Sequence, residues 1–351
     1  MEDIDQVMNE SGILPELNAL AGHSVLITGA TGLIGSSIAD ILFRYNETHA
    51  LPTKVFIGGR SQERAMQRFG KYYKKEYFQF LFYNALNAKH DFPAAVDFVL
   101  HGAGNAFPKM IVKEPVETMV SNFSSLYHLL NDARTYGVKR VLYLSSSEVY
   151  GIRSERIGNE PYCESEYGYI DLLQPRNLYS VGKRAAETLY ISFGDEYGVD
   201  SVIVRPGHIY GPTASLQDNR VASAFAYAAA RGEDIVMKSD GFQKRSYCYC
   251  LDCASAVIKV LLRGENGQAY NIANPDSVIC IGDLAKLIAN AGGVKLLVQE
   301  AEEEEKKGFN PMDNSLLDSE KLLHLGWKGC FNAETGISHM VSILKKMNGW
   351  D

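Results

Sequence analysis

Long hydrophobic runs are missing from this sequence. No apolar stretch reaches the ~20 residues that a membrane-spanning helix needs, although hydrophobic residues make up 46% of the chain. The sequence begins with an acidic segment and lacks the basic region of a signal peptide. We therefore expect a cytoplasmic protein that has no membrane partner.

An excess of positive charge is also missing. The formal net charge is -7 at pH 7, which argues against a general nucleic-acid-binding protein because such proteins present a basic surface. Charged residues at 22% are ordinary for a globular protein. A chain of 351 residues is long enough for one large domain or two medium ones.

Cysteine is scarce. Three of the six cysteines, Cys248, Cys250 and Cys253, lie close together. A structural zinc site needs four ligands, and the sequence has no second cluster to supply the rest. We therefore predict buried, reduced thiols and no bound metal.

Short apolar runs alternate with helical stretches in the first two thirds of the chain. The strand-like runs are 24–28, 54–58, 77–83, 97–101, 140–144 and 200–205. This alternation predicts an α/β protein with a Rossmann, doubly wound parallel sheet. After residue 206 the alternation weakens, which predicts a smaller, mostly helical substrate-binding domain.

Three glycines follow the first strand-like run. Gly29 allows a tight turn, Gly32 lets the backbone approach a pyrophosphate, and Gly35 permits close packing of a helix on the strand. The N-terminus of that helix then faces the phosphates. We therefore predict NAD(P) as cofactor. The turn residues expected to bind it are Gly29, Thr31, Gly32, Leu33, Ile34 and Gly35.

The end of the second run bears on the choice of cofactor. The chain reads Gly58-Gly59-Arg60 and offers no carboxylate to a ribose 2′-hydroxyl. Arg60 can bind a 2′-phosphate through two hydrogen bonds, or it can merely cover the adenine face. These residues favour NADP.

Tyr179 and Lys183 are four residues apart and therefore share one helix face. The Lys183 ammonium is expected to lower the pKa of Tyr179 toward neutrality, so that the phenol can exchange a proton with a substrate oxygen. The hydroxyl of Ser146 can hold the same oxygen. Together with a dinucleotide, this set predicts hydride transfer at a carbinol carbon.

These motifs resemble the extended short-chain dehydrogenase/reductase superfamily, in its sugar-nucleotide epimerase/dehydratase branch. The resemblance covers nearly the whole chain after residue 21. Besides the glycine turn and the Tyr/Lys pair it rests on the segments 101–104, 145–151, 205–212, 245–247, 267–273 and 325–327. It implies a sugar-nucleotide substrate that is oxidised at C4. It also implies a homodimer formed through the apolar helices 115–136 and 179–197.

The resemblance assigns roles residue by residue. Tyr179 is the acid/base, Lys183 holds the ribose and tunes the tyrosine, and Ser146 orients the reacting oxygen. Arg245 grips the nucleotide phosphates, and His208 stands where the branch usually has an asparagine that contacts substrate. Further cofactor contacts are implied at Asn84, Ala85, Ala103 and Asn122.

The reaction subtype depends on the residues after Ser146. Dehydratases of the branch carry Thr-Asp-Glu, whose aspartate is the acid for water loss, but here that position is Ser147. Nucleotide-glucuronate decarboxylases carry Thr-Ser-Glu and tend to place an arginine three residues before the tyrosine, where this chain has Arg176. The resemblance therefore implies a UDP-glucuronate-type decarboxylase, with Ser147 and Glu148 handling protons and Arg176 and Arg245 contacting anions.

Other functions stay open. A 4-epimerase needs the same triad but no carboxylate anchor, and Arg176 would then pair with Asp171 or another surface acid. A 4,6-dehydratase or a 4-keto reductase uses the same oxidation chemistry; a net reductase suits Arg60, whereas a decarboxylase usually holds NAD. A non-catalytic binding protein of this fold would usually have lost Tyr179 or Lys183.

The resemblance also implies domain boundaries. We predict an N-terminal extension at 1–20 and a dinucleotide-binding Rossmann domain at 21–205, joined by 246–263. The sugar-nucleotide-binding domain is expected at 206–245 and 264–351.

Overall fold

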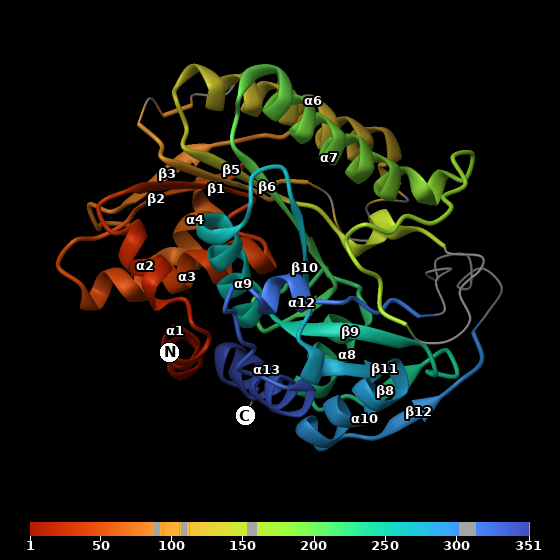
Figure 1. Ribbon diagram of the computed structural model, residues 1–351. Coiled ribbons are helices and arrows are strands. Elements are labelled where there is room, and N and C mark those ends of the chain that lie inside the picture. Colours follow the sequence, from red (N-terminus) through yellow and green to blue (C-terminus); the bar gives the residue numbers. More distant parts are fainter. Residues whose placement is uncertain are drawn as a thin grey trace.

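Seven parallel strands form the central sheet of the computed structural model, which describes residues 1–87, 92–93, 95–104, 106, 111, 113–152, 160–301 and 314–350. The strand order is β10-β6-β5-β4-β1-β2-β3, so the winding reverses between β1 and β4 (Figure 1). The strands are β1 Ser24–Thr28, β2 Lys54–Gly59, β3 Phe78–Phe82, β4 Phe98–His101, β5 Arg140–Leu144, β6 Ser201–Pro206 and β10 Ala269–Ile272. The predicted doubly wound α/β sheet is confirmed.

Helices cover both faces of this sheet, which is why its strands are nearly continuous apolar runs. Figure 1 shows α3 (Leu33–Thr48), α4 (Gln62–Phe69) and α9 (Cys250–Arg263) on one face, and α6 (Pro115–Thr135) and α7 (Leu178–Tyr197) on the other. Helix α3 packs on α9, and α6 packs on α7. The core is therefore divided into one cluster on each side of the sheet.

Two helices precede the sheet, α1 (Glu2–Glu10) and α2 (Leu14–Leu20). The sequence predicted an N-terminal extension at 1–20, and Leu17 of this segment is fully buried in the main core. Glu16 of α2 is also buried and binds Lys259 and Arg263 of α9 at 2.8 and 2.7 Å. These helices therefore pack against the main core.

Two small sheets, β11-β9-β7 and β12-β8, pack with helices near the C-terminus. The remaining elements are η1 Ser147–Tyr150, η2 Pro175–Asn177, β7 His208–Tyr210, α8 Val221–Ala230, β8 Ile235–Met237, β9 Lys244–Tyr249, η3 Pro275–Ser277, β11 Val278–Cys280, α10 Ile281–Gly292, β12 Leu296–Val298, α12 Glu320–Leu323 and α13 Ala333–Asn348. Helices α8, α10 and α13 are the longest elements of this part, as the sequence suggested.

Strand β10 corrects the sequence analysis. It lies in the range 264–351 that was expected to belong to the substrate domain, yet it pairs in parallel with β6 at the edge of the central sheet. Its four residues are too few to show a strand pattern without their partner strand. The division of the chain into two domains stays a prediction.

Candidate active site

The turn that joins β1 to α3 has no room for a side chain at two of its glycines. Gly29 has a φ of +71°, and a Cβ there would lie 2.7 Å from the carbonyl oxygen of Gly102. A Cβ on Gly35 would lie 2.6 Å from the carbonyl oxygen of Gly29. Gly32 is exposed and is the N-cap of α3, so an anion can approach the helix N-terminus. The other predicted turn contacts, Thr31, Leu33 and Ile34, are half-buried.

Further predicted cofactor residues lie just beyond the carboxyl ends of neighbouring strands. Arg60 is exposed directly after β2, and Asn84 and Ala85 are half-buried after β3. Ala103 follows β4, and its N–H donates to Oγ1 of Thr28 at 3.2 Å. Because the carboxyl ends of parallel strands meet at one edge of the sheet, these residues share an edge with the glycine turn.

Asn122 reaches the same region from α6. It is buried, and its Nδ2 donates to the carbonyl oxygen of Thr118 at 2.8 Å. A Cβ on Gly182 of α7 would lie 3.7 Å from this Nδ2, and a Cβ on Gly104 would lie 3.4 Å from the Oδ1. Asn122 therefore lies where α6, α7 and the segment after β4 meet.

Tyr179 and Lys183 stand on the buried face of α7, as the spacing predicted. The Nζ of Lys183 donates to the carbonyl oxygen of Leu144 at 2.7 Å. It lies 5.8 Å from the centre of the Tyr179 ring. The last residue of β5 thus fixes the lysine beside the tyrosine.

The electrostatics of this pair differ from the expectation. The sequence predicted that Lys183 lowers the pKa of Tyr179, but burial raises the pKa of Tyr179 to about 12 and Glu148 adds to the rise. Ser146 and two nearby arginines oppose this rise. Burial lowers the pKa of Lys183 to about 7, against the opposing effect of Glu187. At neutral pH the phenol is therefore a proton donor, while the lysine is close to its titration midpoint.

The residues after β5 face the pair. The Oγ of Ser146 accepts the N–H of Glu148 at 3.2 Å and so begins the turn η1. Ser147 is buried. The carboxylate of Glu148 accepts two hydrogen bonds from Arg176, at 2.6 and 3.1 Å. The structure thus brings Ser146, Glu148 and Arg176 together at Tyr179, and Arg176 pairs with Glu148 rather than with Asp171.

His208 and Arg245 lie on the paired strands β7 and β9. Arg245 is buried, and its Nη1 donates to the carbonyl oxygen of Lys244 at 2.9 Å. The pKa of His208 falls to about 3, because the imidazole is largely enclosed and because Arg245 and Arg220 face it. His208 is therefore neutral near two cations.

The sequence analysis missed Arg220. This residue is the N-cap of α8, and its Nη2 lies 2.6 Å from Oδ2 of Asp218. The Asp218 side chain is fully buried. Arg220 lowers the pKa of both Tyr179 and His208. Its guanidinium therefore lies near both side chains. A basic residue two positions after an aspartate, directly before a helix, was the available signal.

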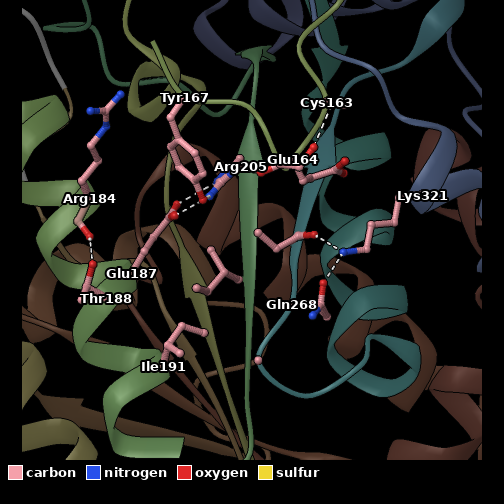
Figure 2. Close-up of a pocket in the computed structure, with 14 residues that line it drawn as sticks. Cys163, Glu164, Tyr167, Arg184, Glu187, Thr188, Ile191, Arg205, Gln268 and Lys321 are labelled. Carbon is pink, nitrogen blue, oxygen red and sulfur yellow. Dashed lines mark hydrogen bonds and ion pairs between the residues drawn. The ribbon is translucent and has the colours of Figure 1, made fainter. Parts of the chain in front are cut away.

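A buried ion pair lies on the other side of Lys183. Glu187 accepts from Arg205 at 3.0 and 2.7 Å and from the hydroxyl of Ser145 at 2.5 Å. Figure 2 shows Glu187, Arg205 and Tyr167 pointing toward one another at a cavity of about 560 Å³. This cavity is also lined by Glu164, Gln268 and Lys321. The sequence analysis gave Glu187 and Arg205 no role.

The three clustered cysteines are buried and free. Cys253 lies on α9, which is buried along most of its length. Within the part of the chain that the structure describes, no group of three His, Cys, Asp or Glu side chains could hold a metal ion. Over the same residues, no helix is both long and apolar enough to span a membrane.

The doubly wound sheet, the glycine turn and the buried Tyr/Lys pair on one helix define an extended short-chain dehydrogenase/reductase. The NAD dependent epimerase/dehydratase family matches residues 25–273, and the chain belongs to this family. It is an enzyme of the sugar-nucleotide decarboxylase, epimerase and dehydratase group, as the resemblance implied.

Curated relatives and solved structures agree with this assignment. UDP-glucuronic acid decarboxylase 3 of Arabidopsis thaliana is 31% identical over 255 residues, which cover 72% of this chain and 69% of the relative. UDP-glucuronic acid decarboxylase 1 of Xenopus tropicalis is 26% identical over 324 residues, covering 92% and 72%.

Two solved structures share the fold. UDP-glucose 4-epimerase from Thermotoga maritima has a TM-score of 0.77 at 22% identity, covering 93% of this chain and 99% of that one. The dTDP-glucose 4,6-dehydratase from Bacillus anthracis, solved in complex with NAD, has a TM-score of 0.75 at 18% identity, covering 93% and 98%.

Proposed function

We propose that this enzyme binds a nucleotide hexuronate, oxidises its C4 hydroxyl and releases carbon dioxide, as a UDP-glucuronate-type decarboxylase does. The observation that carries the proposal is the triplet Ser146-Ser147-Glu148 after β5, which resembles the decarboxylase pattern rather than the dehydratase pattern. Ser147 stands where a dehydratase would need an acid. The decarboxylase relatives support the same substrate class.

The glycine turn fits a dinucleotide, because Cβ atoms at Gly29 and Gly35 would clash with nearby backbone, so the tight turn that presents the N-terminus of α3 needs glycine at both positions. The residues of this turn would hold NAD(P), which would supply a hydride acceptor for the oxidation at C4 and a hydride donor for the reduction that follows. Arg60 supports NADP, whereas the family description and the NAD-bound neighbour support NAD. We propose NAD(P) and test the choice below.

Proton transfer at C4 falls to Tyr179. Its pKa of about 12 must fall before it can take the C4 hydroxyl proton. The ammonium of Lys183 favours that fall, since it stabilises a phenolate. The hydroxyl of Ser146 holds the same oxygen. When C4 is reduced again, Tyr179 returns the proton to it.

Loss of carbon dioxide follows from the ketone at C4. The sugar is then a β-keto acid, so the C5–C6 bond breaks and its electron pair moves into C4–C5 and onto the C4 oxygen. Tyr179 and Ser146 stabilise the resulting enolate by hydrogen bonding. Protonation at C5, for which Glu148 and Ser147 are the candidates, restores the ketone. Arg245 and His208 are proposed to contact the nucleotide part of the substrate.

A 4-epimerase is the second candidate. The observation that favours it is the pairing of Arg176 with Glu148, which already satisfies the guanidinium that a sugar carboxylate would need. An epimerase requires Tyr179, Lys183 and Ser146 but no such anchor.

A panel of nucleotide sugars analysed by mass spectrometry tests the proposal. A decarboxylase lowers the product mass by about 44 units, a dehydratase by about 18, and a reductase raises it by about 2, as the compositions of carbon dioxide, water and two hydrogens require. An epimerase leaves the mass unchanged and moves the chromatographic peak. If no nucleotide hexuronate loses carbon dioxide, the decarboxylase proposal fails.

A further inference from the structure

Three aromatic rings stand in a row next to the Tyr/Lys pair. His101 of β4 and Tyr143 of β5 are partners in the sheet register, and their rings stack at 5.9 Å with an angle of 18°. Tyr143 stacks in turn on Tyr190 of α7, at 4.9 Å and 23°. None of the three is more than 2% exposed. Contacts with His101 and Tyr190 therefore hold the Tyr143 ring in place.

The ammonium of Lys183 meets this ring. Its Nζ lies 4.6 Å from the centre of Tyr143, closer than its 5.8 Å to the centre of Tyr179. A ring face attracts a cation within about 6 Å, and more strongly when water is excluded. The carbonyl oxygen of Leu144 takes one of the three N–H groups. The ring of Tyr143 thus faces a buried ammonium that has one described hydrogen bond.

The far end of the row is fixed as well. The Oγ1 of Thr28 accepts the N–H groups of Gly102 and Ala103, both at 3.2 Å, and lies 2.9 Å from Nδ1 of His101. Both lone pairs of the hydroxyl are then used, so its proton points to Nδ1 and fixes the imidazole next to Tyr143.

The other groups near Lys183 do not fully compensate its positive charge. Glu187, one turn further along α7, shares its charge with Arg205 and accepts from Ser145. Tyr179 is protonated at neutral pH because its pKa is about 12. Among the described residues, the negative charge nearest the ammonium is therefore shared with Arg205. Burial disfavours the charged form of Lys183.

We propose that Tyr143 is a positioning residue whose ring face stabilises the Lys183 ammonium and keeps it beside Tyr179. The hydroxyl of Tyr143 contributes nothing to this, since it has no hydrogen-bond partner among the described residues. The effect of this role on catalysis rests on the proposed proton transfer. The role itself can be tested without substrate, because the charge on Lys183 can be measured in the free enzyme.

The test is an NMR titration of the full chain with ¹³Cε-labelled lysine, in which Lys183→Arg assigns the signal. Tyr143→Phe keeps the ring and should leave the Lys183 midpoint in place. Tyr143→Leu removes the ring and should lower that midpoint by about one pH unit. Phe56→Leu is the matched control, because Phe56 belongs to the same buried cluster, has no described ring contact with the row and should leave the midpoint unchanged.

A second substitution separates the ring's electrostatics from its packing. A fluorinated phenylalanine at position 143 keeps the shape but withdraws charge from the ring face, so it should shift the midpoint in the same direction as leucine. An unchanged midpoint in both variants overturns the proposal, as does a shift in Tyr143→Phe as large as in Tyr143→Leu. If the midpoints shift as expected but no nucleotide sugar is turned over, the proposed function fails while the role of Tyr143 stands.

Discussion

Arg176 holds Glu148 by both carboxylate oxygens, 2.6 Å from Nη1 to Oε2 and 3.1 Å from Nη2 to Oε1. The hydroxyl of Ser180 donates to the same Oε2 at 3.3 Å. Glu148 raises the pKa of Tyr179 and Arg176 lowers it. The ion pair therefore sets how much negative charge the acid/base feels, and any group that competes for Arg176 changes that balance.

Tyr179→Phe should reduce turnover roughly a hundred- to ten-thousand-fold, which is what general acid–base help is worth. The substitution removes the transferable proton but keeps the buried ring, so dinucleotide affinity should change little. Steady-state turnover and calorimetric cofactor binding measure the two effects. Turnover within a few-fold of the parent would remove Tyr179 from the mechanism.

Arg60→Ala should weaken NADP binding roughly ten- to a hundredfold and leave NAD binding nearly unchanged. The reason is that a guanidinium with hydrogen bonds to a phosphate is worth about 1.5–3 kcal/mol, and Arg60 is exposed directly after β2. Calorimetry with both cofactors checks this. Arg64→Ala, also exposed and one helix turn away, is the control. Equal changes for NAD and NADP would contradict the prediction.

The enzyme should be a homodimer that associates through α6 and α7. One stripe of α6 exposes Val116, Val120, Phe123 and Tyr127 by 67%, 42%, 45% and 50%, and exposed apolar stripes of this kind mark interaction surfaces. Light scattering should give twice the chain mass for the parent. Phe123→Glu should give a monomer, whereas Leu51→Glu, at an exposed leucine elsewhere, should not. A parent that stays monomeric at every concentration refutes the prediction.

The sequence predicted the strands that are long enough to carry their own pattern. Strand β5 was placed at 140–144 and matches Arg140–Leu144, because the apolar run after Arg140 can be recognised without its partner strands. Strand β10 was missed because its four residues gain their hydrogen bonds from β6, which is distant in sequence. Likewise, the burial of α1 and α2 depends on contacts with α9.

For the site, spacing predicted residues that share an element but not those that meet across elements. Tyr179 and Lys183 are one helix turn apart, so their shared face was readable. The pairing of Glu148 with Arg176 joins η1 to η2, and the sequence spacing did not predict it. The sign of the Tyr179 pKa shift was also missed, because burial outweighs the effect of neighbouring charges and burial is a tertiary property.

Asp252 should make stability fall as pH rises from about 4 to 6. Burial raises its pKa to about 6 despite hydrogen bonds from the N–H groups of Cys330 and Phe331. Between the unfolded and folded pKa values the folded state binds the extra proton, so the free energy of unfolding decreases with pH, by roughly 3 kcal/mol in all. Urea unfolding across this range measures the slope.

Asp252→Asn should remove that slope and lower stability at every pH, since the amide offers one fewer acceptor to two backbone N–H groups. Asp283→Asn is the control, because Asp283 is largely exposed. A slope that persists in Asp252→Asn would assign it to another group.

Arg176→Ala should weaken binding of a nucleotide hexuronate by about 2–5 kcal/mol, the cost of leaving a charge without its partner. Since Glu148 occupies the guanidinium, the sugar carboxylate must replace it, and Glu148→Gln should therefore bind the hexuronate at least as tightly as the parent. A neutral hexose nucleotide should bind Arg176→Ala almost normally. Calorimetry in a Tyr179→Phe background, where turnover is suppressed, isolates binding. If both nucleotides weaken equally, Arg176 serves only to hold Glu148, and the epimerase candidate gains.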